Sequence, residues 1–430
     1  MLGGSAFRYA VLVIQFVVLA ILARNLTPAD YGRYLMMLGV ATPAAPLIGL
    51  GASESFVLEA SKLMHKGESQ KVGSLVGATL AVAVGMSIGL AAIGGVLLWL
   101  LPFSHTTVVM AGSIISMSIG IGLMLNGAQM LLGIGFEALG AFFQYSAVTF
   151  AGLLSSVPYV LLTTTPTFAG VALVNATAVL LLAAVAILPV LWRCSPKRAD
   201  FATALHLTRV GVRFASMRAL GYGSAWFPAF MAGVLLGPAQ AAYFGLGFRL
   251  AYQAGIPMQM LRFSSRPAIV RAYAQGNYNA IKTTCEGPAA VASGIAIIAI
   301  IASAVAGHWI IGIVFGPDLA LAAPVMTIVL VGVALDAFGC GVDTVLKMTG
   351  YEKLALTIMC ACVGIEFVGL MLASHFGVLA MAWVITAFFG TFAAANMIAV
   401  RRKLGIWIYL DFRSYAAVAA QVRGKIQRRS

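Results

Sequence analysis

The chain has 430 residues, of which 61% are hydrophobic and only 9% are charged. An ordinary soluble domain has about a quarter of its residues charged, so this composition excludes a soluble globular protein. In a soluble protein a formal charge of +14 would suggest nucleic-acid binding. In a membrane protein the positions of the lysines and arginines relative to the bilayer must be considered first, and we expect no nucleic-acid binding.

Apolar runs long enough to cross a bilayer follow one another along the whole chain. The hydrocarbon core needs about 20 apolar residues per helix, and no small-residue cleavage site precedes Arg24, so we expect the first helix to be retained. The sequence predicts an all-α polytopic membrane protein with about 12 transmembrane helices, at about 5–24, 34–52, 73–101, 107–132, 138–163, 168–192, 214–236, 240–261, 287–314, 321–346, 355–374 and 377–400.

Lysine and arginine are concentrated in alternate connections between these runs. Short cytoplasmic loops retain an excess of positive residues, whereas exported loops do not. The connections near Pro102, Pro166, Pro238, Pro317 and His375 hold none, and on the predicted outside only Arg24 and Arg33 remain, around the first turn. This segregation predicts that both termini are cytoplasmic. The positive connections contain Lys62, Lys66 and Lys71; Arg193, Lys197, Arg198, Arg209 and Arg213; Arg262, Arg266, Arg271 and Lys282; Lys347 and Lys353; and the segment from Arg401 to Arg429.

The two halves of the chain resemble one another in outline. The turn at Pro28 recurs at Pro238, and the same offset of 210 residues carries Trp99 onto Trp309. Six helices per half make the repeat parallel, with its axis along the membrane normal. We therefore expect an N-terminal lobe over 1–200 and a C-terminal lobe over 201–400, around a central cavity that opens to either side by rocking, as in a transporter.

The last segment, 401–430, is a basic cytoplasmic tail. Aromatic and aliphatic residues such as Ile406, Trp407 and Tyr409 alternate there with Arg413, Arg423 and further cations. This mixture is typical of an interfacial helix that lies on the membrane. A tail that binds a protein partner is the alternative.

Several motifs resemble one transporter family. Residues Leu22 to Tyr34 read LARNLTPADYGRY, and Leu236 to Tyr243 read LGPAQAAY. They are similar to the paired turns of Wzx-type polysaccharide flippases, which belong to the MOP exporter superfamily. Thr27, Gln240 and Ala242 depart from the usual pattern, which puts the subfamily in doubt. The turn residues that carry the resemblance are Arg24, Pro28, Asp30, Gly32, Pro238, Gly316, Pro317 and Gly350.

The resemblance implies a flippase that moves an undecaprenyl-diphosphate-linked oligosaccharide from the cytoplasmic to the periplasmic leaflet by alternating access. Its place would be the bacterial inner membrane, in the biosynthesis of O-antigen or exopolysaccharide. The implied partners are the lipid-linked oligosaccharide, membrane lipid and other polysaccharide assembly proteins.

Ionisable residues within the runs are expected to face the protein interior, because a charge at the bilayer centre opposes insertion by about 2.5 to 3.5 kcal/mol. On one predicted helix Asp336, Asp343 and Lys347 are spaced i, i+7 and i+11, which places them on one face. The order Asp343 to Lys347 favours an i, i+4 ion pair. The candidate cavity residues with a charge are Arg249, Asp336, Asp343, Glu366, Arg218, Arg8 and Lys347.

Two interpretations of these charges remain open. In the functional one, Arg249, with Arg8 and Arg218, meets the diphosphate through charge and paired donors, while the carboxylates bind a coupling proton or sodium ion. In the structural one, Arg249 pairs permanently with Asp336 or Asp343, the other two arginines snorkel to the interface, and Lys347 marks a helix end.

Uncharged polar residues also occur within the runs. They could face the sugar of a cargo or hydrogen-bond between helices, which is the commoner role. These candidates are Gln15, Asn126, Gln129 and Gln144.

Motifs for enzymes and cofactors are absent from the sequence. The five cysteines and five histidines show no metal-ligand spacing, and no GxxxxGK[ST] loop is present, so we expect neither a metal nor a cofactor. Two rival functions remain: a multidrug and toxin extruder of the same superfamily, and a membrane-embedded polysaccharide polymerase or ligase. The latter usually needs a sizeable periplasmic loop, and the predicted outside connections are short.

Overall fold

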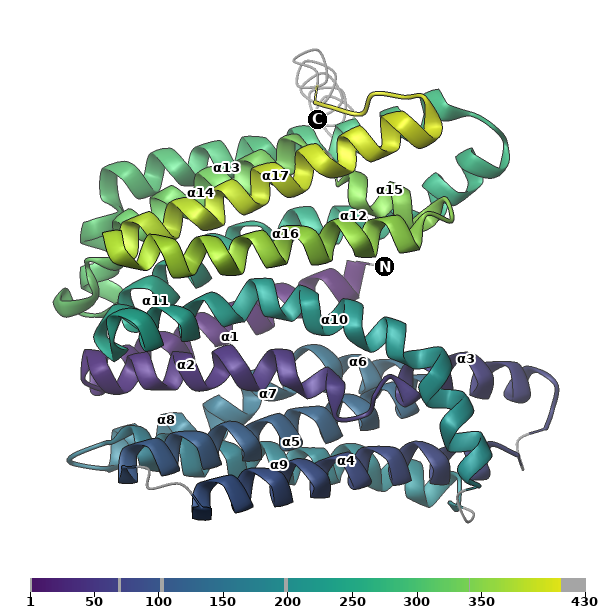
Figure 1. The fold of residues 1–430 in the computed structure, drawn as a ribbon, viewed down its shortest axis with the longest axis horizontal. Helices are drawn as coiled ribbons and strands as arrows, with labels where there is room; N and C mark the ends of the chain where they lie inside the picture. The colour runs from purple at the N-terminus through teal and green to yellow at the C-terminus, as the bar shows by residue number, and fades with distance from the viewer. Residues whose placement is uncertain (1, 69–70, 101–103, 197–199, 340, 411–430) are drawn as a thin grey trace, which may run out of the picture. The chain divides into compact units, whose positions relative to one another are not determined.

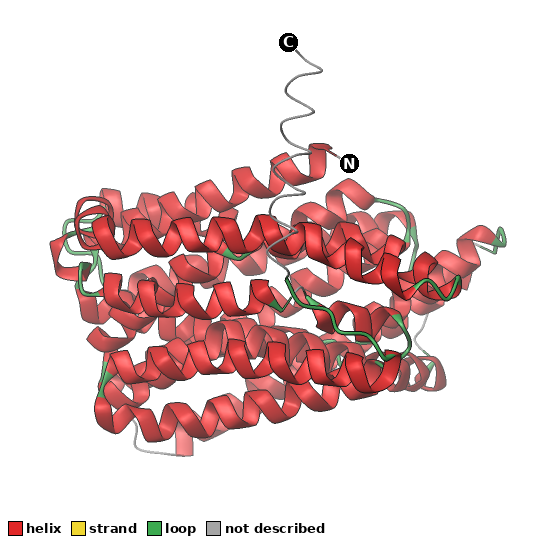
Figure 2. Cartoon of the chain, turned by 90° about the horizontal axis from the view of Figure 1, so that it is seen from above, coloured by secondary structure: helices red, strands yellow, loops and turns green. Residues whose placement is uncertain are grey.

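The structure is a computed structural model that describes residues 2–68, 71–100, 104–196, 200–339 and 341–410, without the side chains of 2–9, 147, 257–261, 263 and 264. Within these ranges all regular secondary structure is helical (Figure 2). The helices group into two compact units, Met1–Ala242 and Tyr243–Ser430, so the predicted all-α fold in two lobes is confirmed.

The first unit contains the helices up to the start of α11 (Figure 1). In chain order they are α1 (Leu2–Asn25), α2 (Pro28–Ala44), η1 (Ala45–Leu47), α3 (Ala52–His65), α4 (Val72–Leu100), α5 (His105–Gly133), α6 (Glu137–Tyr145), α7 (Ala147–Ala151), the π-helical turn η3 (Gly152–Ser156), α8 (Val157–Leu162), α9 (Phe168–Arg193) and α10 (Phe201–Leu236).

The second unit begins within α11 and contains the remaining helices. They are α11 (Pro238–Ala254), α12 (Ile256–Ala274), α13 (Tyr278–Phe315), η4 (Pro317–Leu319), α14 (Ala322–Phe338), α15 (Val342–Met348), α16 (Glu352–Ala373), η5 (Ser374–Phe376) and α17 (Val378–Leu404).

Every predicted apolar run falls on a helix or on consecutive helices. In the described residues, seven helices are long and apolar enough to cross a membrane alone, and there are up to ten spans if each bent pair counts as one. Two predicted spans, the first at the N-terminus and the one over 240–261, are not among these ten. There the described apolar helix Ala10–Asn25 is short, and Gly255 separates α11 from α12.

Three predicted spans are broken rather than continuous. The predicted span 138–163 consists of Glu137–Tyr145 and Val148–Leu162, which are bent by 61°. Between α2 and α3 the chain turns by 43°, at Leu50 and Gly51, which both have positive φ. The prediction of one continuous helix over 321–346 was wrong, because α14 ends at Phe338 and α15 starts at Val342, with a bend of more than 40°. The glycines at 339 and 341 supply the backbone freedom for this break.

The order of elements repeats between the two halves of the sequence. α2 and α11 both have 17 residues and start at Pro28 and Pro238, and α9 and α17 start at Phe168 and Val378. Both pairs share the offset of 210 residues. The boundary at 200 that the repeat suggests stays a prediction, since α10 groups with the first compact unit.

Two helices are far longer than a bilayer requires. α10 has 36 residues and α13 has 38, which at 1.5 Å per residue corresponds to about 54 and 57 Å. The hydrocarbon core is about 30 Å thick. Both helices begin with a polar stretch before their apolar part, around Arg209 and Lys282 respectively.

The two motif turns identified in the sequence lie against each other within the first unit. Thr27 caps α2 by accepting a hydrogen bond from the Asp30 amide at 3.2 Å, and Asp30 pairs with Arg33 at 2.7 Å. A side chain at Gly32 would collide with the backbone carbonyl of Pro238. Gly32 therefore allows the start of α2 to pack directly on the start of α11. The sequence analysis had matched the two turns as a repeat but had not predicted that they touch.

Small residues continue this packing along α2 and α10. A Cβ at Gly39 would lie 2.9 Å from the carbonyl oxygen of Trp226, and Gly233 packs against the Met36 side chain. Close approach through glycine is the usual way in which membrane helices associate, since lipid gives little hydrophobic drive.

The residues after α17 do not continue as the predicted interfacial helix. Gly405 turns the chain with φ +73°, and 405–410 form an irregular segment in which Ile408 is buried. The helix prediction was therefore wrong for these residues, because they find partners in the second unit. Residues 411–430 lie outside the described part of the chain.

Candidate functional site

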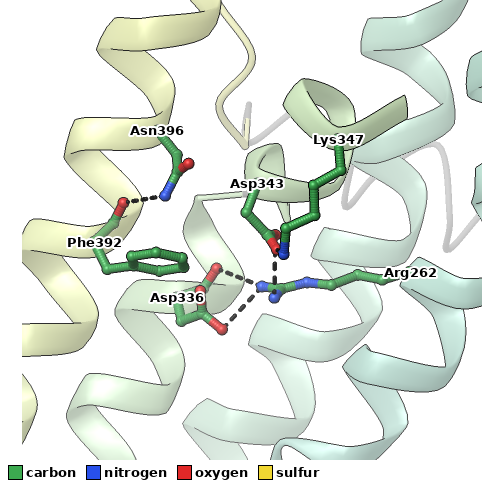
Figure 3. Close-up of polar contacts among 6 residues, drawn as sticks. All are labelled: Arg262, Asp336, Asp343, Lys347, Phe392 and Asn396. Carbon is green, nitrogen blue, oxygen red and sulfur yellow. Dashed lines mark hydrogen bonds and ion pairs between the residues drawn. The ribbon is translucent and has the colours of Figure 1, made fainter. Parts of the chain in front are cut away.

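The break between α14 and α15 places two carboxylates beside one arginine. Asp336 lies in the last turn of α14, Asp343 in the first turn of α15, and Arg262 on α12 (Figure 3). One terminal guanidinium nitrogen of Arg262 lies 2.9 Å from the Asp336 carboxylate, and the other lies 3.7 Å from the Asp343 carboxylate. Arg262 thus bridges the two sides of the break.

Arg262 also forms a hydrogen bond with the backbone at the break. Its terminal nitrogen donates to the carbonyl oxygen of Asp336 at 3.3 Å, in the last turn of α14, where carbonyl groups commonly need a partner from outside the helix. Gly341 has φ +64°, and a Cβ there would lie 2.5 Å from Nε of Arg262. The arginine side chain therefore occupies the space that any other residue at 341 would fill.

A second cation completes the cluster. The Lys347 ammonium lies 2.9 Å from the second oxygen of Asp343, as the i, i+4 spacing predicts. We call Arg262, Asp336, Asp343 and Lys347 the charge cluster. The side chains of Arg262, Asp336 and Asp343 are each less than a fifth exposed. Two cations and two carboxylates make the cluster neutral when all four are ionised, which suits its partly buried position.

The cation that pairs with the aspartates is not the one expected from the sequence. The structural interpretation assigned Arg249 to Asp336 or Asp343, but the structure places Arg262 there. Arg249 lies half-buried on α11. The sequence analysis had counted Arg262 among the cytoplasmic loop cations, because the break at Gly255 and the continuation of α12 to Ala274 were not foreseen.

Glu366 is a second buried acidic position in this unit. It lies on α16 and is 4% exposed, and among the described residues its Oε1 atom has no hydrogen-bond partner. A carboxylate in such surroundings is costly when charged. Glu366 therefore remains a candidate for a group that takes up a proton or cation.

In the first unit Arg218 is held by an acidic residue that the sequence analysis did not select. Arg218 on α10 pairs with Glu54 on α3 at 2.8 Å, a partner that neither interpretation of Arg218 had named. Gly51 and Gly211 touch through their backbones, which brings the two helices close enough for this pair. Glu54 was missed because its partner lies more than 160 residues away in the chain.

The Glu54–Arg218 pair should couple α3 to α10 energetically. We expect Glu54→Gln and Arg218→Gln to destabilise the protein non-additively, with a coupling energy of about 1 kcal/mol or more in a double-mutant cycle. Free energies of unfolding in detergent micelles measure it. The pair Glu59–Lys62, which is exposed on one helix, serves as the control and should give a coupling of less than about 0.5 kcal/mol. Equal coupling in both pairs would contradict the expectation.

Of the uncharged polar candidates in the first unit, Gln129 and Gln144 join two helices. Gln129 on α5 donates to Gln144 on α6 at 3.4 Å. Asn126 is buried, donates to the Gly122 carbonyl at 2.8 Å and packs against Gly49. Gln15 is half-buried on α1, and the side chain of Arg8 lies outside the described part.

The remaining motif residues occupy turns. Arg24 is exposed in the last turn of α1. Gly316 has φ +107° and Pro317 begins η4, while Gly350 has φ +88° before α16. In the described residues no group of three or more His, Cys, Asp or Glu side chains could hold a metal ion.

Solved structures similar to this chain are transporters. A multidrug-resistance MATE-family transporter of the MOP superfamily in an inward-facing conformation matches with a TM-score of 0.70 and 13% identity, over 91% of this chain and 94% of that chain. The lipid II flippase MurJ in an inward closed conformation matches with a TM-score of 0.71 and 10% identity, over 98% and 90%.

A MOP-superfamily transporter from Pyrococcus furiosus, described as having a binding pocket of reverse polarity, matches with a TM-score of 0.55 and 14% identity over 93% of each chain. No protein-family model matches the sequence, and no curated protein does. At these identities the comparisons define the fold: the chain has the two-lobe helical fold of MOP-superfamily transporters.

Proposed function

We propose that the protein is a flippase that carries a polyprenyl-diphosphate-linked oligosaccharide from the cytoplasmic to the periplasmic leaflet of a bacterial inner membrane. The observation that supports this most strongly is the likeness to a lipid II flippase over 98% of the chain. The Leu22–Tyr34 motif, with its resemblance to polysaccharide flippases, narrows the cargo to a lipid-linked oligosaccharide, and both termini would be cytoplasmic.

In this proposal the lobes over 1–200 and 201–400 rock around the cargo. The charge cluster and the Glu54–Arg218 pair hold helices together, because each cation there already has a carboxylate within 4 Å. Arg249 meets the diphosphate, for which a guanidinium offers paired donors. Glu366 takes up the coupling proton or cation.

A multidrug extruder is the second candidate, because a MATE-family transporter matches the chain almost equally well. Such extruders ordinarily bind organic cations through acidic residues. Here Glu54, Asp336 and Asp343 are each paired with an arginine. That arrangement compensates these three carboxylates and so argues against their binding a cationic cargo.

A membrane enzyme of polysaccharide assembly is disfavoured. A polymerase or ligase usually needs a large periplasmic loop with catalytic residues. In the described residues, the connections that follow α8, α10 and α13 are only a few residues long. They leave no room for such a loop.

Reconstitution tests the proposal directly. Proteoliposomes that contain a defined polyprenyl-diphosphate oligosaccharide should show its translocation, and Arg249→Ala should slow translocation about tenfold, because a hydrogen bond to a charged group contributes about 1.5 to 3 kcal/mol. Arg249→Lys should retain part of the rate through its charge. Arg193→Ala, at an exposed arginine at the end of α9, is the matched control and should translocate normally.

The outcomes separate the candidates. If wild type and Arg249→Ala translocate the lipid at the same rate, Arg249 is not part of the cargo site, but the protein is still a flippase. Transport of a fluorescent organic cation, without movement of any diphosphate lipid, would support the extruder instead.

A further inference from the structure

The helix ends around the C-terminal segment 405–410 form a surface that is both basic and aromatic. A hydrophobic cluster gathers the end of α12, the start of α13, α15, the start of α16 and the end of α17, and it includes Ile408. Residues Ile406 and Leu410 pack against the same cluster. The segment is therefore fixed on this end of the second unit.

Three cations at this end lie over aromatic rings. Arg401 stacks on Trp407 at 4.4 Å, Lys282 lies over Tyr409 at 5.5 Å, and Lys403 lies over Tyr351 at 5.8 Å. Trp407 is 40% and Tyr409 47% exposed. We call these six residues the basic-aromatic face.

The charges of this face stay available to an anion. A cation–π contact positions a cation but, unlike a carboxylate, does not neutralise it. Among the described residues only Lys282 of the three has a carboxylate within 4 Å, Glu286 at 3.6 Å. The neighbouring Arg271, Lys353 and Arg402 are exposed, and so is Glu352 at the start of α16. The face therefore differs from the charge cluster, whose cations are compensated.

We propose that the basic-aromatic face binds the headgroup of an anionic phospholipid, of the phosphatidylglycerol class, in the adjacent leaflet. Tryptophan and tyrosine favour the depth of the lipid headgroups, and basic residues at the same depth attract anionic lipid. The docked segment 405–410 places Trp407 and Tyr409 beside cations of α17 and α13. This lipid site is independent of the cargo in the proposed function.

Fluorescence quenching tests the site in the full-length chain. The protein is reconstituted in phosphatidylcholine vesicles with a fraction of brominated phosphatidylglycerol or brominated phosphatidylcholine, and the emission of Trp407 is taken as the difference between wild type and Trp407→Phe. We expect stronger quenching by brominated phosphatidylglycerol. Lys403→Gln, which leaves the Trp407 contact intact, should reduce the preference about fivefold, as expected for one charge near an anionic surface.

Two controls sharpen the result. Arg401→Lys keeps the charge and should keep the preference, whereas Arg401→Gln should lose it about as much as Lys403→Gln does. Lys62→Gln removes a cation that Glu59 already compensates at 3.0 Å, and should change nothing. Equal quenching by the two lipids, an equal loss in Lys62→Gln, or complete displacement of phosphatidylglycerol by a polyprenyl diphosphate would each overturn the proposal.

Discussion

Replacing Arg262 by alanine is expected to lower the free energy of unfolding by about 3 kcal/mol. Removing one partner of a buried ion pair leaves an uncompensated charge, at a cost of about 3 to 5 kcal/mol. We take the lower end because the Arg262 and Asp336 side chains are each 17% exposed. Denaturant titration in detergent micelles measures the change.

The companion variant distinguishes charge from packing. Arg262→Leu combined with Asp336→Leu removes both partners, while Asp343 keeps Lys347. Because apolar replacement of a whole buried pair is often neutral or stabilising, the double variant should lie within about 1 kcal/mol of wild type. A single variant as stable as wild type would show that the cluster contributes nothing to the fold.

Gly32→Ala is expected to destabilise the protein by about 3 kcal/mol, the upper end for overpacking in a close-packed interior. The reason is that the added Cβ meets the backbone carbonyl of Pro238, which cannot rotate away as a side chain can. The same titration measures the loss, and the yield of folded protein in the membrane should fall with it.

Gly85→Ala is the matched control for this substitution. Gly85 lies within α4, and a Cβ there has nothing within 4 Å in the described structure. Its replacement should change the free energy of unfolding by no more than about 1 kcal/mol, in the direction of greater helix stability. If Gly32→Ala and Gly85→Ala changed the free energy of unfolding equally, the close approach of Gly32 to Pro238 would not contribute to stability.

Most of the fold could be predicted because its strongest signal is composition. Apolar runs, separated by turn residues such as Gly237 and Pro238, define helices whatever their partners are. The internal breaks could not be predicted in the same way. Gly255, Gly341 and Gly51 lie among many glycines in this chain, and only tertiary packing decides which of them bend a helix.

Within the charge cluster, the sequence predicted the pair inside one helix but not the pairs between helices. Spacing along one helix linked Asp343 to Lys347 correctly, since i, i+4 neighbours depend on local geometry alone. The partners Arg262 and Glu54 come from other helices, and no periodicity in one sequence encodes which helices adjoin. Arg262 was also hidden by its position just after an apolar run, where a loop cation is the ordinary interpretation.

The excess length of α10 and α13 has a consequence for what the aqueous phase meets. A helix of about 55 Å in a hydrocarbon layer of about 30 Å must extend beyond it by some 25 Å when upright. Both helices carry their polar turns at the amino-terminal end, near Arg209 and Lys282. With the predicted orientation, the polar amino-terminal turns of both helices would project from the bilayer into the cytosol, where a soluble partner could bind them.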